Sequence, residues 1–310
     1  MKIYKFIILY FLLTTLSHAN LRQEFPSYSY VLTEFNVNEN YIDNFEFQNF
    51  VNEHKHDYKK RFIHAVQRGS LIIPLMKEIM YKRDISPVFL YISMVESAFN
   101  PEACSRTGAG GLWQITVNTA KELKLTINST IDERYDPIRS TNAAVKYLYK
   151  INNNLNSWYL TTMAYNCGNG CVDKSIQRAG SRDLGTLISL KKSYIKEETK
   201  KYIKKILLMA MIGENYLFKN NDRIGELMYK MNNDSITPVN VRAGEKISRI
   251  ASVLNMNKSY LEKINAHLKN GHAPYNHNYS INIPQSKVKM FDLHYAHVIR
   301  AKYKSYAQYR

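Results

Sequence analysis

Apolar residues recur every three or four positions from about residue 41 to residue 218, and short polar breaks separate the runs. This spacing is typical of amphipathic helices that bury one face. After residue 234 the pattern changes to shorter apolar runs between turn-forming residues. We therefore expect an all-α unit without internal repeats, followed by a smaller unit of another kind.

The first clear helix begins at residue 86. Ser86 is suited to capping its N-terminus, Pro87 fits the first helical position, and Asn100-Pro101 ends it. Its core-facing stripe consists of Val88, Ile92, Val95 and Phe99. Glu96 lies on the flank of that stripe, so we expect a half-buried carboxylate, although position alone also fits a solvated helix end. Burial and the negative end of the helix dipole would both raise its pKa toward the range of a general acid.

Three more helices are expected downstream. Asp136-Pro137 opens the first, Ser157 caps the second, which ends at Gly168, and a long third begins near Tyr194. The apolar face of the first helix consists of Ile138, Val145, Leu148 and Ile151. That of the third consists of Ile195, Tyr202, Ile206 and Met209.

The C-terminal unit reads as strand, helix, helix, strand. Strands are expected at 237–242 and 279–284, a turn at Ala243-Gly244, and short helices at 247–254 and 259–268. A unit of about fifty residues is enough for a small binding module. The basic, tyrosine-rich residues after it form either a terminal helix or a frayed tail.

The N-terminus has the three parts of a secretory signal. Lys2 and Lys5 carry the charge, residues 6–13 form the apolar stretch, and Ser17-His18-Ala19 is a small-x-small cleavage site. No cysteine for lipid attachment follows the site, and the apolar stretch is too short for a good membrane span. We expect an exported, soluble protein without an integral membrane segment after cleavage.

The chain is strongly basic, with a formal net charge of +17, which removal of the two leader lysines lowers to +15. Such a charge favours anionic partners, namely nucleic acid, acidic lipid or an acidic wall polymer. Export argues against nucleic acid. Because the lysines are spread along the chain, a lysine-rich composition without function is the alternative.

The three cysteines, Cys104, Cys167 and Cys171, are an odd number in an oxidising compartment. One disulfide and one free thiol are expected, and the sequence leaves the pairing open. A bridge from Cys104 to Cys167 is one hypothesis, because each lies near a candidate site motif. No metal site is expected, since a second close cysteine pair and a suitably placed histidine are missing.

Several motifs accompany Glu96. Gly110-Gly111-Leu112-Trp113-Gln114 combines glycines that allow close backbone approach with an amide suited to sugar hydroxyls and N-acetyl groups. Ala164-Tyr165-Asn166 adds an aromatic platform and a second amide. Glu198 and Tyr202 lie one turn apart on the last long helix. Each motif alone also fits a glycine loop, a core tyrosine or a solvated helix face.

In this order the motifs closely resemble the goose-lysozyme-like catalytic domain of lytic transglycosylases, in particular the membrane-bound lytic murein transglycosylase D type. The resemblance covers about residues 54–215. Residues 236–285 resemble a LysM module. The chain departs from the transglycosylase D type in two ways, since the lipid-attachment cysteine often found in that type is missing and only one LysM-like unit is visible. The transglycosylase resemblance rests on residues 96–101, 111–114, 132–137 and 164–166. The LysM resemblance rests on residues 241–247, Asn265 and residues 281–284.

The resemblance implies a mainly α fold, with a lysozyme-like helical catalytic domain followed by a small α+β module. The expected segments are a signal peptide at 1–19, an N-terminal helical extension at 20–53, the transglycosylase domain at 54–220, the LysM-like peptidoglycan-binding module at 236–285 and a basic tail at 286–310. It also implies a periplasmic, wall-associated protein that acts on peptidoglycan strands without a cofactor. The sequence identifies no protein partner.

The resemblance also implies a mechanism with one acid. Glu96 would protonate the bond between N-acetylmuramic acid and N-acetylglucosamine and then deprotonate the C6 hydroxyl, which closes a 1,6-anhydro ring without water. By the same resemblance Tyr202 would orient Glu96, and Glu198 would support the site. The other implied site residues are Ser97, Gln114 and Asn166 for sugar binding and Tyr165 for the shape of the cleft.

Three alternatives remain on the sequence. A hydrolytic muramidase on the same fold would use the same acid with a positioned water. A non-catalytic wall-binding protein would use the LysM-like unit alone. A nucleic-acid-binding protein rests on charge and conflicts with export. The sequence leaves open whether cleavage is internal or from strand ends, whether the stem peptide affects it, and how the two units are arranged.

Overall fold

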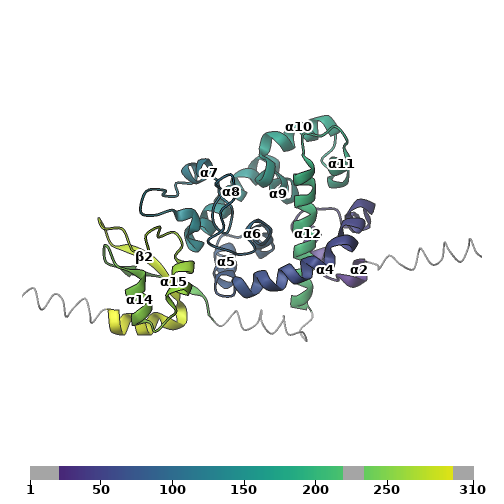
Figure 1. The fold of residues 1–310 in the computed structure, drawn as a ribbon. Helices are drawn as coiled ribbons and strands as arrows, with labels where there is room; N and C mark the ends of the chain where they lie inside the picture. The colour runs from purple at the N-terminus through teal and green to yellow at the C-terminus, as the bar shows by residue number, and fades with distance from the viewer. Residues whose placement is uncertain (1–20, 219–233, 296–310) are drawn as a thin grey trace, which may run out of the picture.

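A computed structural model describes residues 21–218 and 234–295 (Figure 1). The signal peptide predicted at 1–19 and residues 296–310 of the predicted basic tail lie outside the described residues. The described part is mainly helical with one small two-stranded sheet, which confirms the predicted fold class.

The N-terminal part is helical throughout. In chain order its elements are α2 (Leu21–Glu24), α3 (Tyr28–Glu34), η1 (Glu39–Asp43), α4 (Phe45–Arg68), α5 (Ile72–Tyr81), η2 (Pro87–Phe89), α6 (Leu90–Ser97), α7 (Val117–Glu122), η3 (Glu133–Tyr135), α8 (Pro137–Leu155), α9 (Trp158–Cys167), α10 (Asn169–Ala179), α11 (Leu184–Ser189) and α12 (Glu197–Phe218). The long helix α12 packs against α3, α4, α6 and α9, and Figure 1 shows it standing beside α9 and crossing α4. The apolar residues predicted for this helix are buried, although it begins three residues after Tyr194.

Helix α6 begins and ends as its local sequence dictates, with two adjustments. The Ser86 hydroxyl accepts a hydrogen bond from the Val88 N–H at 3.4 Å, and the first turn after it is a 3-10 helix. The helix ends at Ser97, two residues before the expected end, because Ala98 and Phe99 adopt φ values of 50° and 55°. This left-handed turn buries the Phe99 ring completely.

Asp136 caps the N-terminus of α8, whereas Ser157 does not cap that of α9. The Asp136 carboxylate accepts hydrogen bonds from the N–H groups of Ile138 and Arg139 at 2.8 and 2.9 Å, which confirms the predicted start of α8. Helix α9 begins after Ser157 and ends at Gly168, as expected. The prediction that Ser157 caps it is wrong, because the Ser157 side chain makes no capping hydrogen bond.

The C-terminal unit has the predicted order of strand, helix, helix and strand. Its elements are β1 (Ile236–Val241), α14 (Ile247–Val253), α15 (Lys258–Ile264), β2 (Tyr279–Pro284) and η4 (Gln285–Lys287). The strands pair antiparallel, with Ile236 opposite Pro284 and Val241 opposite Tyr279. Asn265 joins the end of α15 to β2, since its amide donates to the Asn282 carbonyl at 2.7 Å and accepts from the Asn282 N–H at 2.7 Å.

The C-terminal unit docks on the segment between α7 and α8 of the helical part. Its backbone contacts are the Asp132 N–H donating to the His267 carbonyl at 2.9 Å and the Lys269 N–H donating to the Thr130 carbonyl at 3.0 Å. Strand β1 also packs against α5. These backbone hydrogen bonds tie the two units together and favour one arrangement of them.

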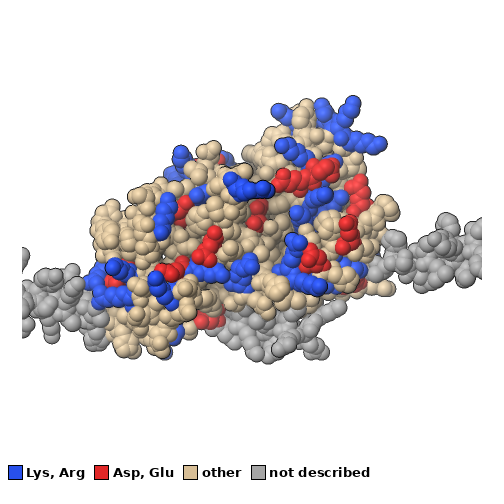
Figure 2. Space-filling model, viewed as in Figure 1, with Lys and Arg blue, Asp and Glu red and all other residues tan. Residues whose placement is uncertain are grey.

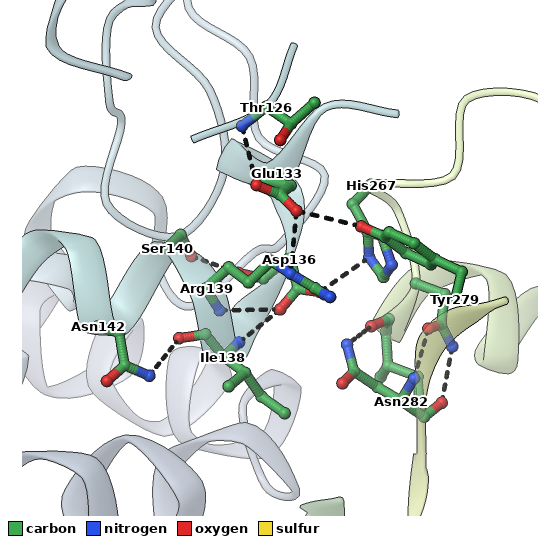
Figure 3. A network of polar contacts seen from close by, with 12 residues as sticks. Thr126, Glu133, Asp136, Ile138, Arg139, Ser140, Asn142, His267, Tyr279 and Asn282 are labelled. Carbon is green, nitrogen blue, oxygen red and sulfur yellow. Dashed lines mark hydrogen bonds and ion pairs between the residues drawn. The ribbon is translucent and has the colours of Figure 1, made fainter. Parts of the chain in front are cut away.

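A buried polar network reinforces this junction (Figure 3). Arg139 forms ion pairs with Glu133 at 3.0 Å and Asp136 at 2.6 Å, and its guanidinium lies over the Tyr279 ring at 4.8 Å from the ring centroid. The Tyr279 hydroxyl donates to Glu133 at 3.3 Å, and His267 Nδ1 lies 3.5 Å from Asp136 Oδ2. The charged side chains of the helical part, Arg139, Glu133 and Asp136, thus contact the rings of Tyr279 and His267 from the C-terminal unit.

Candidate active site

Glu96 lies in the last turn of α6 at the edge of a cavity of about 650 Å³. Helices α4, α6 and α12 supply most of the cavity wall, and the loop residues 103–105 together with Gln114 supply the rest. The cavity is partly open to solvent. It is therefore the natural place to look for substrate binding.

The Glu96 carboxylate is set up to exchange a proton near neutral pH. Burial raises its pKa to about 7, against the opposing effect of Tyr202, whose hydroxyl donates to Oε1 at 2.5 Å. The negative charge of Glu198 raises the pKa further, and the positive charge of Lys205 lowers it. A carboxyl group with such a pKa can donate a proton and take it back.

The glycine loop approaches the 132–137 motif closely, which confirms the close backbone approach expected of its glycines. Gly111 has φ of 76°, and a Cβ atom there would lie 2.0 Å from the Arg134 carbonyl oxygen. A Cβ atom on Gly110 would lie 2.8 Å from the Tyr135 ring. The loop can hold this position only because both residues lack side chains.

Arg134 also holds the glycine loop in place through hydrogen bonds. Its Nε and Nη2 donate to the Asp132 carboxylate at 3.0 and 2.7 Å, and its Nη1 donates to the carbonyls of Gly108 at 2.6 Å and Ile115 at 3.2 Å. Arg134 and Asp132 are both buried, so the charges depend on these bonds. The 132–137 motif therefore braces the loop that carries Gln114.

Ser97 and Gln114 line the cavity, and both also hold the loop in place. The Ser97 hydroxyl donates to the Leu112 carbonyl at 2.8 Å, which ties α6 to the loop. The Gln114 Nε2 donates to the carbonyls of Gly111 at 2.9 Å and Ala103 at 3.2 Å. The amide oxygen of Gln114 is the group left to face a ligand.

Tyr165 and Asn166 are not among the residues that line this cavity. The Tyr165 hydroxyl donates to the Trp113 carbonyl at 2.7 Å, and its ring packs edge-on against Tyr147. Burial, and next the charge of Glu96, raise the pKa of Tyr165, so its phenol stays protonated. Asn166 accepts a hydrogen bond from the Thr199 hydroxyl. Tyr165 is therefore tied to the residue before Gln114, and Asn166 to the first turn of α12.

Glu198 and Tyr202 both come from α12, but their positions differ. Tyr202 is buried and bonded to Glu96, whereas Glu198 is exposed in the first turn of the helix and lies outside the cavity lining. Glu198 therefore acts on Glu96 through its charge.

Sequence reasoning missed the wall that α4 provides. Tyr58, Arg61, His64 and Arg68 line the cavity from this helix, and Lys205 lines it from α12. Their spacing along α4 indicated one helix face. Nothing in that spacing pointed toward Glu96, because α4 and α6 are brought to one cavity by packing against α12, which depends on the tertiary fold.

The cysteine pairing differs from the Cys104–Cys167 hypothesis. The disulfide joins Cys167, at the end of α9, to Cys171 in the first turn of α10, and their Cα atoms are 6.0 Å apart. Cys104 is a free, exposed thiol that lines the cavity. The hypothesis is wrong because the chain turns at Gly168 between α9 and α10. This turn brings Cys167 and Cys171 within bonding distance of each other.

Residues 21–218 and 234–295 contain neither a cluster of metal-ligating side chains nor a helix able to span a membrane. No group of three or more histidine, cysteine, aspartate or glutamate side chains converges there as a metal site. None of the helices in these ranges combines the length and the apolar character needed to cross a bilayer.

Residues 74–188 match the family model described as "Transglycosylase SLT domain". The chain is 31% identical over 191 residues to membrane-bound lytic murein transglycosylase D of Escherichia coli K12, which covers 61% of this chain and 40% of that protein. The chain thus spans less than half the length of this curated relative. Glu96, Gln114 and Asn166 lie within residues 74–188, the segment that matches the family model. Helix α4 and Tyr202 lie outside that segment.

Two solved structures are similar to part of this chain. The 70 kDa soluble lytic transglycosylase of Escherichia coli is 25% identical, with a TM-score of 0.40, over 51% of this chain and 26% of that one. An inactive mutant of lytic transglycosylase Slt from Pseudomonas aeruginosa is 23% identical, with a TM-score of 0.38, over 45% and 23%. The family model and the curated relative together support the class of lytic transglycosylases.

Proposed function

We propose that this protein is a peptidoglycan lytic transglycosylase. It cleaves the β-1,4 bond between N-acetylmuramic acid and N-acetylglucosamine and leaves a 1,6-anhydro end. The SLT domain match at residues 74–188 and the transglycosylase D relative support the class. The observation that carries the proposal is a half-buried Glu96, with a pKa of about 7, at the edge of an open cavity.

The cavity offers one carboxylate, which favours a mechanism with a single acid and base. Of the described residues that line it, Glu96 alone carries a carboxyl group. Most glycosidases need a second carboxylate, either as nucleophile or to activate water. Glu198 is exposed and outside the lining, so it is poorly placed for either role. The nucleophile then comes from the substrate.

The chemical steps balance without water. Protonated Glu96 gives its proton to the glycosidic oxygen as the bond from that oxygen to C1 of the muramic acid breaks. The neighbouring N-acetyl group assists departure. The C6 hydroxyl then attacks C1, and the Glu96 carboxylate takes up the hydroxyl proton. Tyr202 holds the carboxylate in place for both transfers, with its hydroxyl 2.5 Å from Oε1.

The C-terminal unit, residues 236–285, acts in this proposal as a LysM-like module that holds peptidoglycan. Its order of strand, helix, helix and strand supports the assignment. The relative is described as membrane-bound, which supports a location in the cell envelope. We place the protein in the periplasm, associated with the wall, with glycan strands as its partner and no cofactor.

Mass spectrometry of peptidoglycan digested with the mature protein tests the proposal. Anhydromuropeptides from the wild type and none from Glu96→Gln are expected, since glutamine keeps the shape and removes the titrating proton. Products heavier by one water, with reducing ends, would replace the proposal by a hydrolytic muramidase. Substantial activity in Glu96→Gln would mean that another residue is the acid. No release by the wild type would favour a wall-binding protein without catalysis.

A further inference from the structure

A basic stripe lines one side of the cavity that contains Glu96. Arg61, His64 and Arg68 follow one another at steps of three and four residues on α4, so their side chains share one helix face. Lys205 of α12 lines the same cavity and lies close enough to lower the pKa of Glu96. We call Arg61, His64, Arg68 and Lys205 the basic wall.

The basic wall is only partly neutralised by its surroundings. Asp57 accepts from Arg61 Nε at 2.8 Å, and both side chains are more than half exposed, so the pair contributes little. Arg68 Nη1 donates to the Ala98 carbonyl at 3.2 Å. Each guanidinium has five N–H donors, and these contacts use a few of them. The carboxylate of Glu96 is itself held partly neutral by its raised pKa.

The basic wall carries charge of one sign, unlike the face of the molecule that Figure 2 displays. Figure 2 shows lysine and arginine side chains mixed with aspartate and glutamate over the face that it displays. In the cavity, three permanent cations stand against one carboxylate among the described lining residues. A neutral glycan would not require this excess, because sugar hydroxyls and N-acetyl groups carry no charge.

We propose that Arg61 and Arg68 bind a carboxylate carried by the substituent of muramic acid, and that they make the enzyme select strands with free carboxylates. This inference rests on the proposed function. Two sources share that chemistry: the lactyl group, where the peptide has been removed, and the acidic residues of an attached stem peptide. Arginine suits either, since its planar fork matches a carboxylate in bidentate geometry.

The test compares kcat/KM on three forms of the same soluble glycan. One carries its native stem peptides, one has its carboxylates converted to amides, and one has its peptides removed by an amidase, which leaves lactyl carboxylates. We expect amidation to lower kcat/KM of the wild type about tenfold, because each exposed charge pair contributes a factor of up to about five. The difference should shrink as salt is added.

Variants assign this selectivity to the basic wall. In Arg61→Gln/Arg68→Gln the ratio of kcat/KM on native over amidated glycan should fall to near one, and Arg61→Lys/Arg68→Lys should retain most of it. Lys60→Gln is the matched control, since Lys60 is exposed on the same helix and outside the cavity lining. It should keep the wild-type ratio. Because both rates are measured on one protein, the ratio does not depend on how much of it is folded.

Each outcome has a meaning of its own. A native-over-amidated ratio well above one assigns the carboxylates of the stem peptide. A ratio near one, with a higher kcat/KM on the peptide-free strands than on the other two substrates, assigns the lactyl carboxylate. Equal kcat/KM of the wild type on all three substrates, or selectivity that is unchanged in Arg61→Gln/Arg68→Gln, overturns this inference and leaves the proposed function standing. Cleavage of none of the three substrates defeats the proposed function itself.

Discussion

The Tyr202 hydroxyl lies 2.5 Å from Oε1 of Glu96, although the two residues are 106 positions apart in the chain. This hydrogen bond stabilises the carboxylate, whereas burial of the same group stabilises the acid. The pKa of about 7 is the result of the two opposing effects, with burial the larger. The protonated and ionised forms that a single acid and base needs are thus both populated near neutral pH.

Replacing Tyr202 with phenylalanine should move the pH profile of the enzyme. The general acid must be protonated, so kcat/KM of the wild type should fall as the pH rises through about 7. Without the hydrogen bond, the pKa of Glu96 rises, and this alkaline limb should move up by about one unit. Tyr165→Phe is the control, because the Tyr165 hydroxyl bonds to Trp113. If the limb stays in place in Tyr202→Phe, the hydrogen bond does not tune the acid.

Glu96→Gln should stabilise the protein at alkaline pH while it abolishes turnover. The folded-state pKa of Glu96 is raised from 4.5 to about 7, so the folded protein holds a proton that the unfolded chain has lost between these values. Stability therefore declines as the pH rises through this window, by up to about 3 kcal/mol. Glutamine removes the decline.

Chemical denaturation of both proteins at about pH 5 and about pH 8 measures this effect. The advantage of Glu96→Gln over the wild type should be larger at the higher pH. An equal difference at both pH values would contradict the raised pKa.

Gly111→Ala should destabilise the protein and impair the site. Its Cβ would lie 2.0 Å from the Arg134 carbonyl oxygen, at a φ of 76° that alanine adopts poorly. The two effects together should cost about 3 kcal/mol. Gly170→Ala is the matched control, since a Cβ there meets nothing within 4 Å and the residue lies in α10, so it should gain about 0.5 kcal/mol. Urea denaturation compares them, and similar losses in both would refute the steric argument.

The elements that could be predicted from the sequence are those whose causes are local. Asp136 caps α8 with its own side chain, and two residues of sequence suffice to see it. The strands and helices of the C-terminal unit follow from short apolar runs between turns. Ser157 shows the limit, because the helix after it starts where expected, but the Trp158 N–H donates to Asn36 Oδ1 at 3.0 Å and the Ser157 hydroxyl makes no capping hydrogen bond.

The candidate site was predictable only in part. The order of the motifs pointed to Glu96 and Gln114, and both line one cavity. It could not show that the amide nitrogen of Gln114 donates to a carbonyl of its own loop. The basic wall on α4 depends on how α4 crosses α12, and no local pattern contains that crossing. The disulfide was equally inaccessible, since three cysteines allow three pairings.

His267 makes the junction between the two units sensitive to acid. Its side chain is fully buried, neither ring nitrogen has a hydrogen-bond partner among the described residues, and Asp136 lies 3.5 Å from Nδ1. Burial lowers the pKa of His267 below its ordinary value of 6.5, against the smaller opposing effect of Asp136, and the charge of Arg139 adds to the lowering. The unfolded chain therefore takes up a proton that the folded protein resists, and the contribution of this residue to stability should fall as the pH drops below about 6.5.

Replacing His267 with leucine should flatten this acid dependence, because leucine fills a similar volume and cannot be protonated. Thermal unfolding is followed between about pH 7 and pH 5 in both proteins, and His267→Leu should gain stability relative to the wild type as the pH falls. His277→Leu, an exposed histidine of the same unit, should behave as the wild type. Glu96 titrates over the same range with the opposite sign, but it is present in both proteins, so the difference between the two slopes reports the histidine. An unchanged slope in His267→Leu would show that the junction does not titrate through this residue.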